Sequence, residues 1–129
     1  MNSRDYKDLL VWRKAMEAAR DTYILLRKLP LEEKFALADQ MRRCAVSIPS
    51  NIAEGQGRSK AGEFAQFIGY AQGSRAELQT QLLLAKDFGY LSEEDIEPLF
   101  YLLEEIGKML YSLKQTLLPP NDVNKTPDC

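Results

Sequence analysis

The chain has 129 residues, 45% hydrophobic and 28% charged, a composition typical of one soluble globular domain. Its formal net charge is −2, so the chain as a whole is not a generic binder of polyanions. No apolar run reaches the roughly 18 residues that a membrane helix needs, and the N-terminus lacks the apolar segment of a signal peptide. We therefore expect a cytoplasmic protein with no membrane partner.

Four amphipathic segments, each apolar at spacings of three and four residues, predict four long helices. The stripe of the first segment comprises Leu9, Trp12, Met16, Ala19, Tyr23 and Leu26. Pro30 ends this helix, because proline disfavours helical backbone at the preceding residue. The stripe of the second segment comprises Phe35, Ala38, Met41, Ala45, Ile48 and Ile52. Pro49 predicts a kink in the second helix, and Gly55 and Gly57 are expected to form its C-terminal exit.

The stripe of the third segment comprises Phe64, Phe67, Ala71, Ser74, Leu78, Leu82 and Ala85, with Gly89 as the expected C-terminal glycine. Ser92 is expected to cap the fourth helix, with Asp95 at the capping-box position. The fourth stripe comprises Leu99, Leu102, Ile106, Met109, Leu113 and Leu117. Pro98 predicts a kink or a loose first turn in this helix.

No segment shows the alternation of a strand, so we predict an all-α fold. The expected architecture is an antiparallel up-down-up-down four-helix bundle over residues 1–118, with the second helix kinked at Pro49. Residues 119–129 are expected to form a disordered polar C-terminal tail. Charge is uneven, with a net of +3 over residues 1–30 and −4 over residues 91–120. This asymmetry favours a basic face on one side or a head-to-tail alignment of subunits.

The residue types present exclude several kinds of site. The chain has no histidine, which removes the Ser-His-Asp and Cys-His nucleophile arrangements and His-ligated zinc. Its two cysteines, Cys44 and Cys129, make no disulfide framework and are wrongly spaced for zinc. Cys44 lies in a helical pattern and is expected to be a small buried side chain. We expect no metal, no cofactor and no catalytic residue.

The stretch SIPSNIAEGQGRS, residues 47–59, interrupts the apolar patterns with polar side chains and glycines. It is not a phosphate loop, because a helical pattern precedes it and no lysine occupies the Walker position. Within and around it, polar residues recur at helical spacing and share one broad face: Arg43, Ser47, Asn51, Glu54 and Arg58. The third helix carries a matching set that includes Ser74 and Glu77.

Two interpretations of these polar sets stay open. In the first, Arg43, Ser47, Asn51, Glu54, Ser74 and Glu77 form a structural network or a subunit interface, with Arg43 or Arg75 pairing with Glu54 or Glu77. In the second, Glu54 and Glu77 form an acid–base pair of an enzyme, although no nucleophile or metal-ligand set accompanies them.

A group of basic residues in the same region predicts a nucleic-acid contact, with Trp12 and Tyr70 available for base stacking. Its members are Arg42, Arg43, Arg58, Lys60 and Arg75. The alternative is that these arginines pair with nearby acidic residues and that Trp12 belongs to the core.

The segments RRCAVSIPSNIAEGQGRS and EFAQFIGYAQGSRAELQTQLLLAKDFGYLS resemble the 23S rRNA intervening-sequence proteins, a bacterial four-helix-bundle family. The resemblance extends over roughly residues 5–118, and its signature positions here are Arg43, Ser47, Asn51, Glu54, Gly55, Ser74 and Glu77. That family is similar to the accessory variability determinant proteins of retroelements, which work with a reverse transcriptase and bind nucleic acid. The resemblance implies a homo-oligomeric ring, a pentamer, and no enzyme activity.

These observations predict a non-enzymatic, homopentameric binding or scaffold protein whose partner is RNA, a ribonucleoprotein or a reverse transcriptase. The net acidic charge of this chain weakens the prediction of a reverse transcriptase as partner, because the retroelement proteins are strongly basic. The first alternative is a purely structural self-assembling protein with no nucleic-acid role. The second is the enzyme that uses Glu54 and Glu77.

Overall fold

A computed structural model describes residues 5–118 and contains four long helices joined by short connections. The helices are α1 (Leu10–Leu25), α2 (Leu37–Gln56), α3 (Ala61–Asp87) and α4 (Glu93–Leu117). Short 3₁₀ turns precede α1 and connect it to α2, at Tyr6–Asp8, Leu26–Lys28 and Leu31–Glu33. No strand occurs among the described residues, so the predicted all-α four-helix fold is confirmed. The expected C-terminal tail lies outside these residues.

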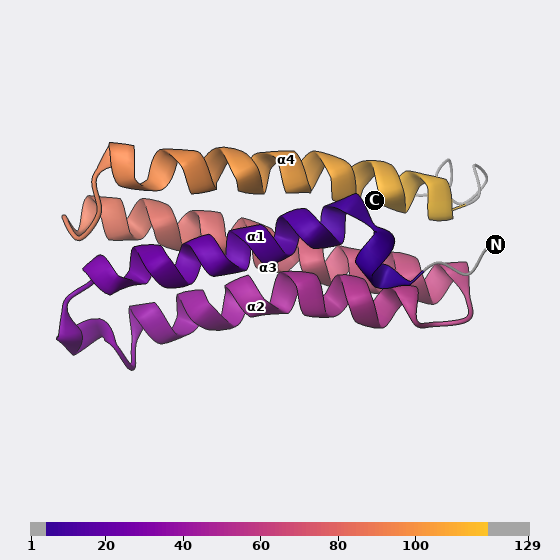
Figure 1. Cartoon of the computed structure of the whole chain (residues 1–129), viewed down its shortest axis with the longest axis horizontal. Coiled ribbons are helices and arrows are strands. Elements are labelled where there is room, and N and C mark those ends of the chain that lie inside the picture. Colours follow the sequence, from indigo (N-terminus) through magenta and orange to yellow (C-terminus); the bar gives the residue numbers. More distant parts are fainter. Residues whose placement is uncertain (1–4, 119–129) are drawn as a thin grey trace, which may run out of the picture.

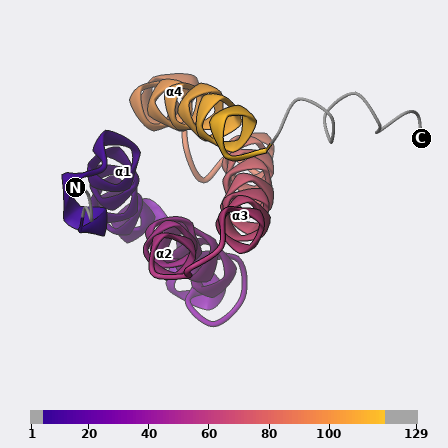
Figure 2. The same ribbon diagram turned by 90° about the vertical axis from the view of Figure 1, so that its right-hand side faces the viewer.

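The chain reverses direction at each connection, so consecutive helices run in opposite directions along the long axis (Figure 1). Seen from one end, the four helices occupy the corners of a four-sided arrangement in chain order (Figure 2). Each helix therefore packs against two neighbours, and α1 and α4 also lie side by side. The contact between α2 and α3 is the most extensive of the four.

Aliphatic side chains from α2, α3 and α4 fill most of the interior. The largest fully buried ones are Met41, Ile48, Ile52, Ile68, Leu78, Leu82, Leu103, Ile106 and Leu110. Burying each such side chain contributes about 1.5–3 kcal/mol relative to leaving it in water, which makes this core the main driving force for folding. In α2, the predicted stripe from Ala38 to Ile52 is the face that is buried.

The buried face of α1 is offset by one residue from the predicted stripe. Its buried residues are Val11, Ala15, Ala18 and Thr22. Thr22 is accommodated because its hydroxyl donates to the carbonyl of Ala18 at 2.7 Å. Most of the predicted stripe lies beside this face, partly or fully exposed: Leu9, Trp12, Met16, Ala19 and Tyr23. Thus α1 has two apolar faces, and the core uses the one with the smaller side chains.

The connection between α1 and α2 corrects a second expectation. Phe35 was the first residue predicted for the stripe of the second helix, yet its side chain is 85% exposed, and α2 begins only at Leu37. The side chain of Glu33 accepts a hydrogen bond from the backbone N–H of Leu37 at 3.2 Å, which satisfies one of the free donors of the first turn. The other carboxylate oxygen of Glu33 accepts from the hydroxyl of Tyr90 at 2.8 Å. This bond raises the pKa of Tyr90 and joins the connection to the segment between α3 and α4.

Gly55 is not the helix exit that the sequence predicts, because it lies buried within the last turn of α2. A Cβ atom at this position would lie 2.7 Å from the Cβ of Phe67 and 2.9 Å from the Cδ1 of Phe64. Glycine is therefore required for the close approach of α3. Gly57 is the C-cap of α2, with a φ of −77°. Pro49 lies inside α2, and the kink there stays a prediction.

The segment between α3 and α4 follows the predicted chemistry. Gly89 has a φ of +84°, a conformation that favours glycine after a helix end. The hydroxyl of Ser92 accepts from the N–H of Asp95 at 3.0 Å, and the carboxylate of Asp95 accepts from the N–H of Ser92 at 2.9 Å. The expected capping box is thereby confirmed. Pro98 lies inside α4, and the distortion expected there stays a prediction.

The uneven charge of the sequence is partly matched within the chain, because basic α1 lies beside acidic α4. Lys14 and Glu105 form an ion pair at 3.3 Å, and Lys28 and Asp95 form one at 2.6 Å. The hydrogen bond from Lys28 lowers the pKa of Asp95. A carboxylate with a lowered pKa stabilises the fold above its unfolded-state pKa, and this contribution is lost as the pH falls through the folded-state value. Among residues 5–118, no helix has both the length and the apolar character to cross a membrane.

The close approach at Gly55 predicts that Gly55→Ala destabilises the bundle by about 1–3 kcal/mol, since Phe64 and Phe67 must move to admit a methyl group. Gly62→Ala is the matched control, because a Cβ at Gly62 meets nothing within 4 Å. The control should be neutral or stabilising by up to about 1 kcal/mol, as expected for alanine in a helix. Urea unfolding followed by circular dichroism measures both changes. Equal stability of the two variants would contradict the packing role of Gly55.

Candidate functional site

Three of the predicted polar residues meet at the contact between α2 and α3. The hydroxyl oxygens of Ser47 and Ser74 lie 2.8 Å apart, within hydrogen-bond distance. The side-chain amide of Asn51 donates to both the carbonyl and the hydroxyl oxygen of Ser47, each at 2.8 Å. Because these groups are only partly exposed, each hydrogen bond satisfies a polar atom at the helix contact. The three side chains can therefore fix the position of α2 along α3.

The charged members of the predicted network do not join this cluster. Arg43 pairs with Asp39 on its own helix at 3.0 Å, and Glu54 pairs with Arg58 at 2.8 Å. Arg75 hydrogen-bonds to two glutamines. The predicted pairing of Arg43 or Arg75 with Glu54 or Glu77 is therefore wrong. These side chains find partners one helical turn away, where reaching them needs less ordering of the chain.

Glu77 lies instead near Cys44, at the same helix contact. Burial raises the pKa of the Cys44 thiol to about 11, and the negative charge of Glu77 adds to this effect. The thiol is therefore protonated at neutral pH, and Cys44 is a small buried side chain as predicted. Gln81 lies beside it, and its buried side-chain oxygen has no hydrogen-bond partner among residues 5–118.

The two carboxylates considered for acid–base chemistry are both at the surface. Glu54 is exposed and engaged by Arg58, and Glu77 is also exposed. Neither carboxylate thus lies in an enclosed pocket, which the enzyme interpretation requires. Within the described part of the chain, no three Cys, Asp or Glu side chains gather closely enough to hold a metal ion.

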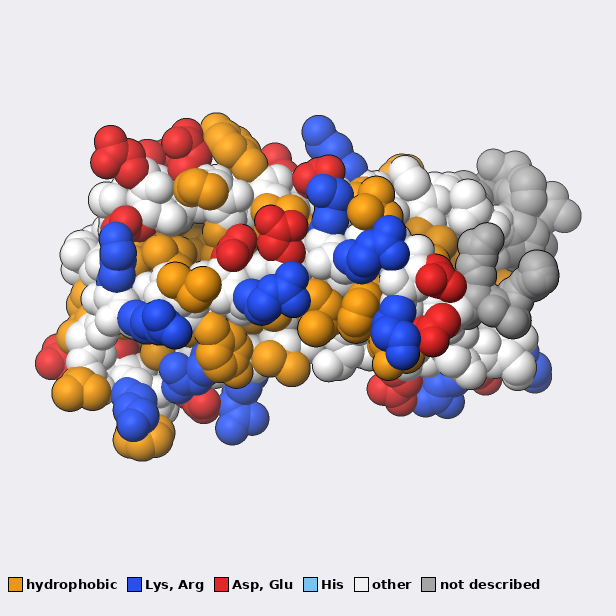
Figure 3. Space-filling view, in the orientation of Figure 1, with side chains coloured by type: hydrophobic (Ala, Val, Ile, Leu, Met, Phe, Trp, Pro, Cys, Tyr) orange, Lys and Arg blue, Asp and Glu red, His pale blue; other side chains and the backbone are white. Residues whose placement is uncertain are grey.

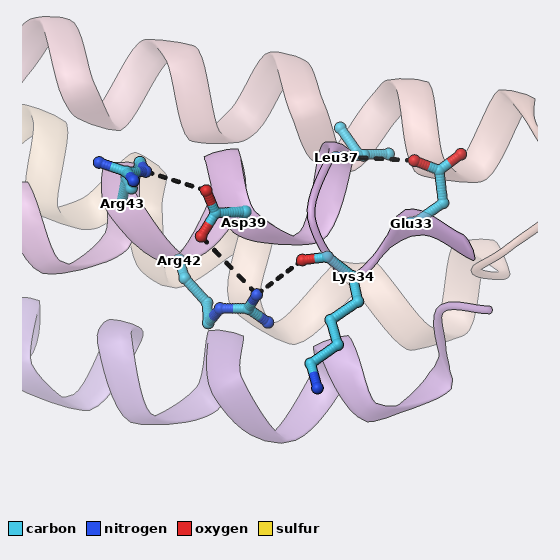
Figure 4. A network of polar contacts seen from close by, with 6 residues as sticks. All are labelled: Glu33, Lys34, Leu37, Asp39, Arg42 and Arg43. Carbon is cyan, nitrogen blue, oxygen red and sulfur yellow. Dashed lines mark hydrogen bonds and ion pairs between the residues drawn. The ribbon is translucent and has the colours of Figure 1, made fainter. Parts of the chain in front are cut away.

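The five basic residues predicted to contact nucleic acid lie in three separate places. Arg42 and Arg43 flank Asp39 near the start of α2, where Arg42 also donates to the carbonyl of Lys34 at 2.8 Å (Figure 4). Arg58 lies beyond the other end of α2, and its guanidinium is 4.7 Å from the centre of the Phe67 ring. Lys60 is exposed at the N-cap of α3.

Arg75 occupies the third place, in the middle of α3, and its partners connect it to α4. Gln72 accepts from its Nε at 2.7 Å, and Gln79 accepts from its terminal nitrogen. The sequence predicted Arg75 as a nucleic-acid contact or as a partner of Glu54 or Glu77, and did not predict its bonds to the two glutamines. The available signal was the spacing of Gln72, Arg75 and Gln79, three and four residues apart on one helix face.

The aromatic residues considered for stacking are also placed apart. Trp12 and Tyr6 form a T-shaped ring contact, with ring centres 5.2 Å apart, and Trp12 is only partly buried. Tyr70 packs against Phe67 on α3, with ring centres 5.3 Å apart. Over the face shown in Figure 3, basic and acidic side chains are interspersed with hydrophobic ones and form no single basic patch.

The hydrogen bonds of Asn51 predict that Asn51→Leu lowers the free energy of unfolding by about 1–2 kcal/mol, because Ser47 loses its donor. Lys108→Ala is the control, since Lys108 is exposed and a surface substitution of this kind changes stability by less than about 0.5 kcal/mol. Urea unfolding and size-exclusion chromatography measure stability and assembly together. Equal behaviour of the two variants would show that Asn51 does not fix the helix contact.

Comparison with known proteins relates the chain to one family and to solved structures. The sequence profile of the family described as 23S rRNA-intervening sequence protein matches residues 7–112. A crystal structure of a protein of unknown function from the S23 ribosomal protein family of Bacteroides thetaiotaomicron is similar, with a TM-score of 0.77 and 27% identity. That similarity covers 82% of this chain and 99% of the other. No curated protein matches the chain. Since the profile spans most of the bundle, the chain belongs to the family of 23S rRNA-intervening sequence proteins.

Proposed function

We propose that this chain is a non-enzymatic bundle that self-associates head to tail into a ring and serves as a binding or scaffold module. The observation that carries the proposal is the presence of two surfaces that the core of the bundle does not use, one a mostly apolar groove and the other a helix face without charged residues. They lie on different sides of the molecule and differ in shape, so each can receive the other from a second copy.

The first surface is a groove of about 360 Å³ between α1 and α2. It is formed largely by the apolar face of α1 that the core leaves open, together with apolar side chains of α2. Its apolar lining comprises Trp12, Met16, Ala19, Val46, Pro49 and Ala53, and Tyr6, Arg20 and Ser50 complete it. Val46 is 44% exposed although it lies in the middle of a helix. An open row of large apolar side chains of this kind is typical of a protein–protein contact.

The second surface is the outer face of α3, which we define as Gly69, Gly73, Ala76, Thr80 and Leu83. These residues recur at spacings of four and three and therefore share one helix face. None of them is charged, whereas the outer face of a solvated helix is normally rich in charged residues. A Cβ at Gly73 meets nothing within 4 Å, so the face is open there, whereas a Cβ at Gly69 would lie 3.4 Å from the Nζ of Lys114. Its small side chains allow another copy to approach closely.

The two surfaces define a head-to-tail contact. The α1–α2 groove and the outer face of α3 lie on different sides of the bundle, because α1 and α3 occupy opposite corners (Figure 2). A contact between unlike surfaces repeats from copy to copy and forms a ring when the rotation closes. The pentameric number rests on the resemblance to the family rather than on this geometry.

The arrangement predicts that the unaltered chain elutes well above the 14.7 kDa of one chain in size exclusion with light scattering. Gly73→Arg on the outer face of α3 and Val46→Glu in the groove should each give folded monomers. A mixture of these two variants should give a dimer, since each retains the surface that the other lacks. Gln115→Arg, at an exposed position near the end of α4, is the control and should assemble normally.

A chain that stays monomeric at all concentrations would refute self-association. Monomeric variants that fail to form a dimer when mixed would refute the head-to-tail contact, because that contact leaves one intact pair of surfaces.

We further propose that the assembled ring contacts RNA or a ribonucleoprotein. The description of the family mentions 23S rRNA, and the protein in the similar crystal structure is assigned to the S23 ribosomal protein family. Among the predicted cations, Lys60 is exposed and has no ion pair or hydrogen bond through its side chain to any other described residue. A reverse transcriptase is the less favoured partner, because the net charge of the chain is −2.

RNA contact predicts a gel shift with structured RNA whose affinity falls as salt rises, because binding releases counterions. Lys60→Ala should weaken binding and reduce the salt slope by about 1. Arg58→Ala should have a smaller effect, because Arg58 is already paired with Glu54. Lys86→Ala is the matched control, since Lys86 is held by Glu93 at 2.9 Å. No shift at micromolar protein would favour the alternative of a purely structural assembly.

A further inference from the structure

Arg75 is the centre of a polar cluster that joins α3 to α4. Its guanidinium donates to the side-chain oxygens of Gln72 and Gln79. The amide of Gln72 then donates to the carbonyl of Gly107 at 3.0 Å, and the amide of Gln79 donates to the carbonyl of Phe100 at 3.5 Å. The two glutamines therefore fix the orientation of the guanidinium against α4.

The partners of this guanidinium are neutral. Arg75 is half-buried, yet no carboxylate of residues 5–118 forms an ion pair with it. Partial burial of a cation without a counter-charge is unfavourable, so an arginine that serves only to join two helices is expected to have an acidic partner. Arginine has five N–H donors, and the two glutamines use two of them. Three donors are left for a ligand.

The backbone of α4 leaves room for this side chain. A Cβ at Gly107 would lie 2.7 Å from the Nε of Arg75 and 2.9 Å from its Cζ. Glycine in a helix interior costs about 1 kcal/mol relative to alanine. Here it allows the guanidinium to lie directly on the helix backbone.

Arg75 also lines an open cleft of about 380 Å³ between α3 and α4. The other side chains that line it are Glu104, Lys108, Tyr111 and Ser112. Within the described part of the chain, none of these four side chains makes a hydrogen bond or an ion pair. Arg75, Lys108 and Glu104 give the cleft a formal net charge of +1, and the hydroxyls of Tyr111 and Ser112 add two neutral donors.

We propose that this cleft binds a phosphate group. The guanidinium, the ammonium of Lys108 and the two hydroxyls offer more donors than the two oxygens of a carboxylate need. A phosphate group has more acceptor oxygens, and arginine and lysine are the residues that commonly bind it. Glu104 opposes the anion and limits its affinity. The site depends neither on ring formation nor on RNA contact through Lys60.

The direct test is an NMR titration of the full chain with inorganic phosphate, with sodium chloride added to a reference sample to match ionic strength. The Nε–Hε signal of Arg75 should shift and saturate, while chloride alone should not move it. Lys108→Ala, at an exposed position, should weaken binding severalfold. Glu104→Gln should strengthen it about fivefold, since it removes the opposing charge. If Arg75 has a purely structural role, neither substitution should change the response of its Nε–Hε signal to phosphate.

Two further variants serve as the negative and the positive control for phosphate binding. Gly107→Ala should displace the guanidinium and abolish the saturable shift, and thermal unfolding shows whether the variant is folded. Arg58→Ala is the control with a distant cation removed, and it should bind phosphate as the unaltered chain does. The proposal would be overturned if the unaltered chain showed no saturable shift. It would also be overturned if Lys108→Ala and Glu104→Gln bound phosphate with equal affinity.

A final comparison identifies the source of the phosphate. A short RNA with a 5′-phosphate is compared with the same RNA carrying a 5′-hydroxyl, both at the Arg75 signal. Competition by the phosphorylated RNA alone indicates a phosphorylated RNA end as the ligand. Absence of competition by either RNA, with inorganic phosphate still bound, indicates a small phosphate compound.

Discussion

The close contact between α2 and α3 is the constraint on which the rest of the structure depends. It requires a residue without a side chain at Gly55, where Phe64 and Phe67 occupy the space of a Cβ. Farther along the same contact, small hydroxyl side chains meet at 2.8 Å in the Ser47–Ser74 pair. Close packing of two helices removes apolar surface from water and also excludes water from polar side chains at the contact. Such polar side chains must therefore hydrogen-bond to one another. The polar and glycine residues of SIPSNIAEG meet this requirement.

The same constraint explains why the family signature is a poor guide to chemistry. Its members Ser47, Asn51, Gly55 and Ser74 lie at the α2–α3 contact. Glu54 is an exposed ion-pair partner, and Glu77 lies near a protonated thiol. Residues that a family shares for packing can thus resemble an active site in the sequence, because hydrogen bonding and catalysis use the same side chains. The surfaces that we assign to assembly and to phosphate lie on other faces.

Those surfaces arise from how α1 and α4 complete the bundle. Alanines bring α1 close to the core and turn its larger apolar side chains, such as Trp12 and Met16, toward a groove. On α4, Gly107 lets Arg75 lie against the helix backbone beside an open cleft. In both places a small residue at a helix contact determines what the neighbouring surface presents. Ion pairs at Lys14–Glu105 and Lys28–Asp95 join α4 to α1 and to the 3₁₀ turn that follows α1.

The sequence by itself determined the four helices, the capping box at Ser92 and the glycine after α3, because hydrophobic period and capping chemistry are local properties. It could not determine which of two adjacent apolar stripes of α1 is buried, since both have helical spacing and only the neighbouring helices choose between them. It also could not assign partners to Arg43, Arg75 and Glu54, because each had several oppositely charged or polar residues within reach. Tertiary structure decided these points: packing fixes the rotation of each helix about its own axis, and that rotation sets which side chains meet.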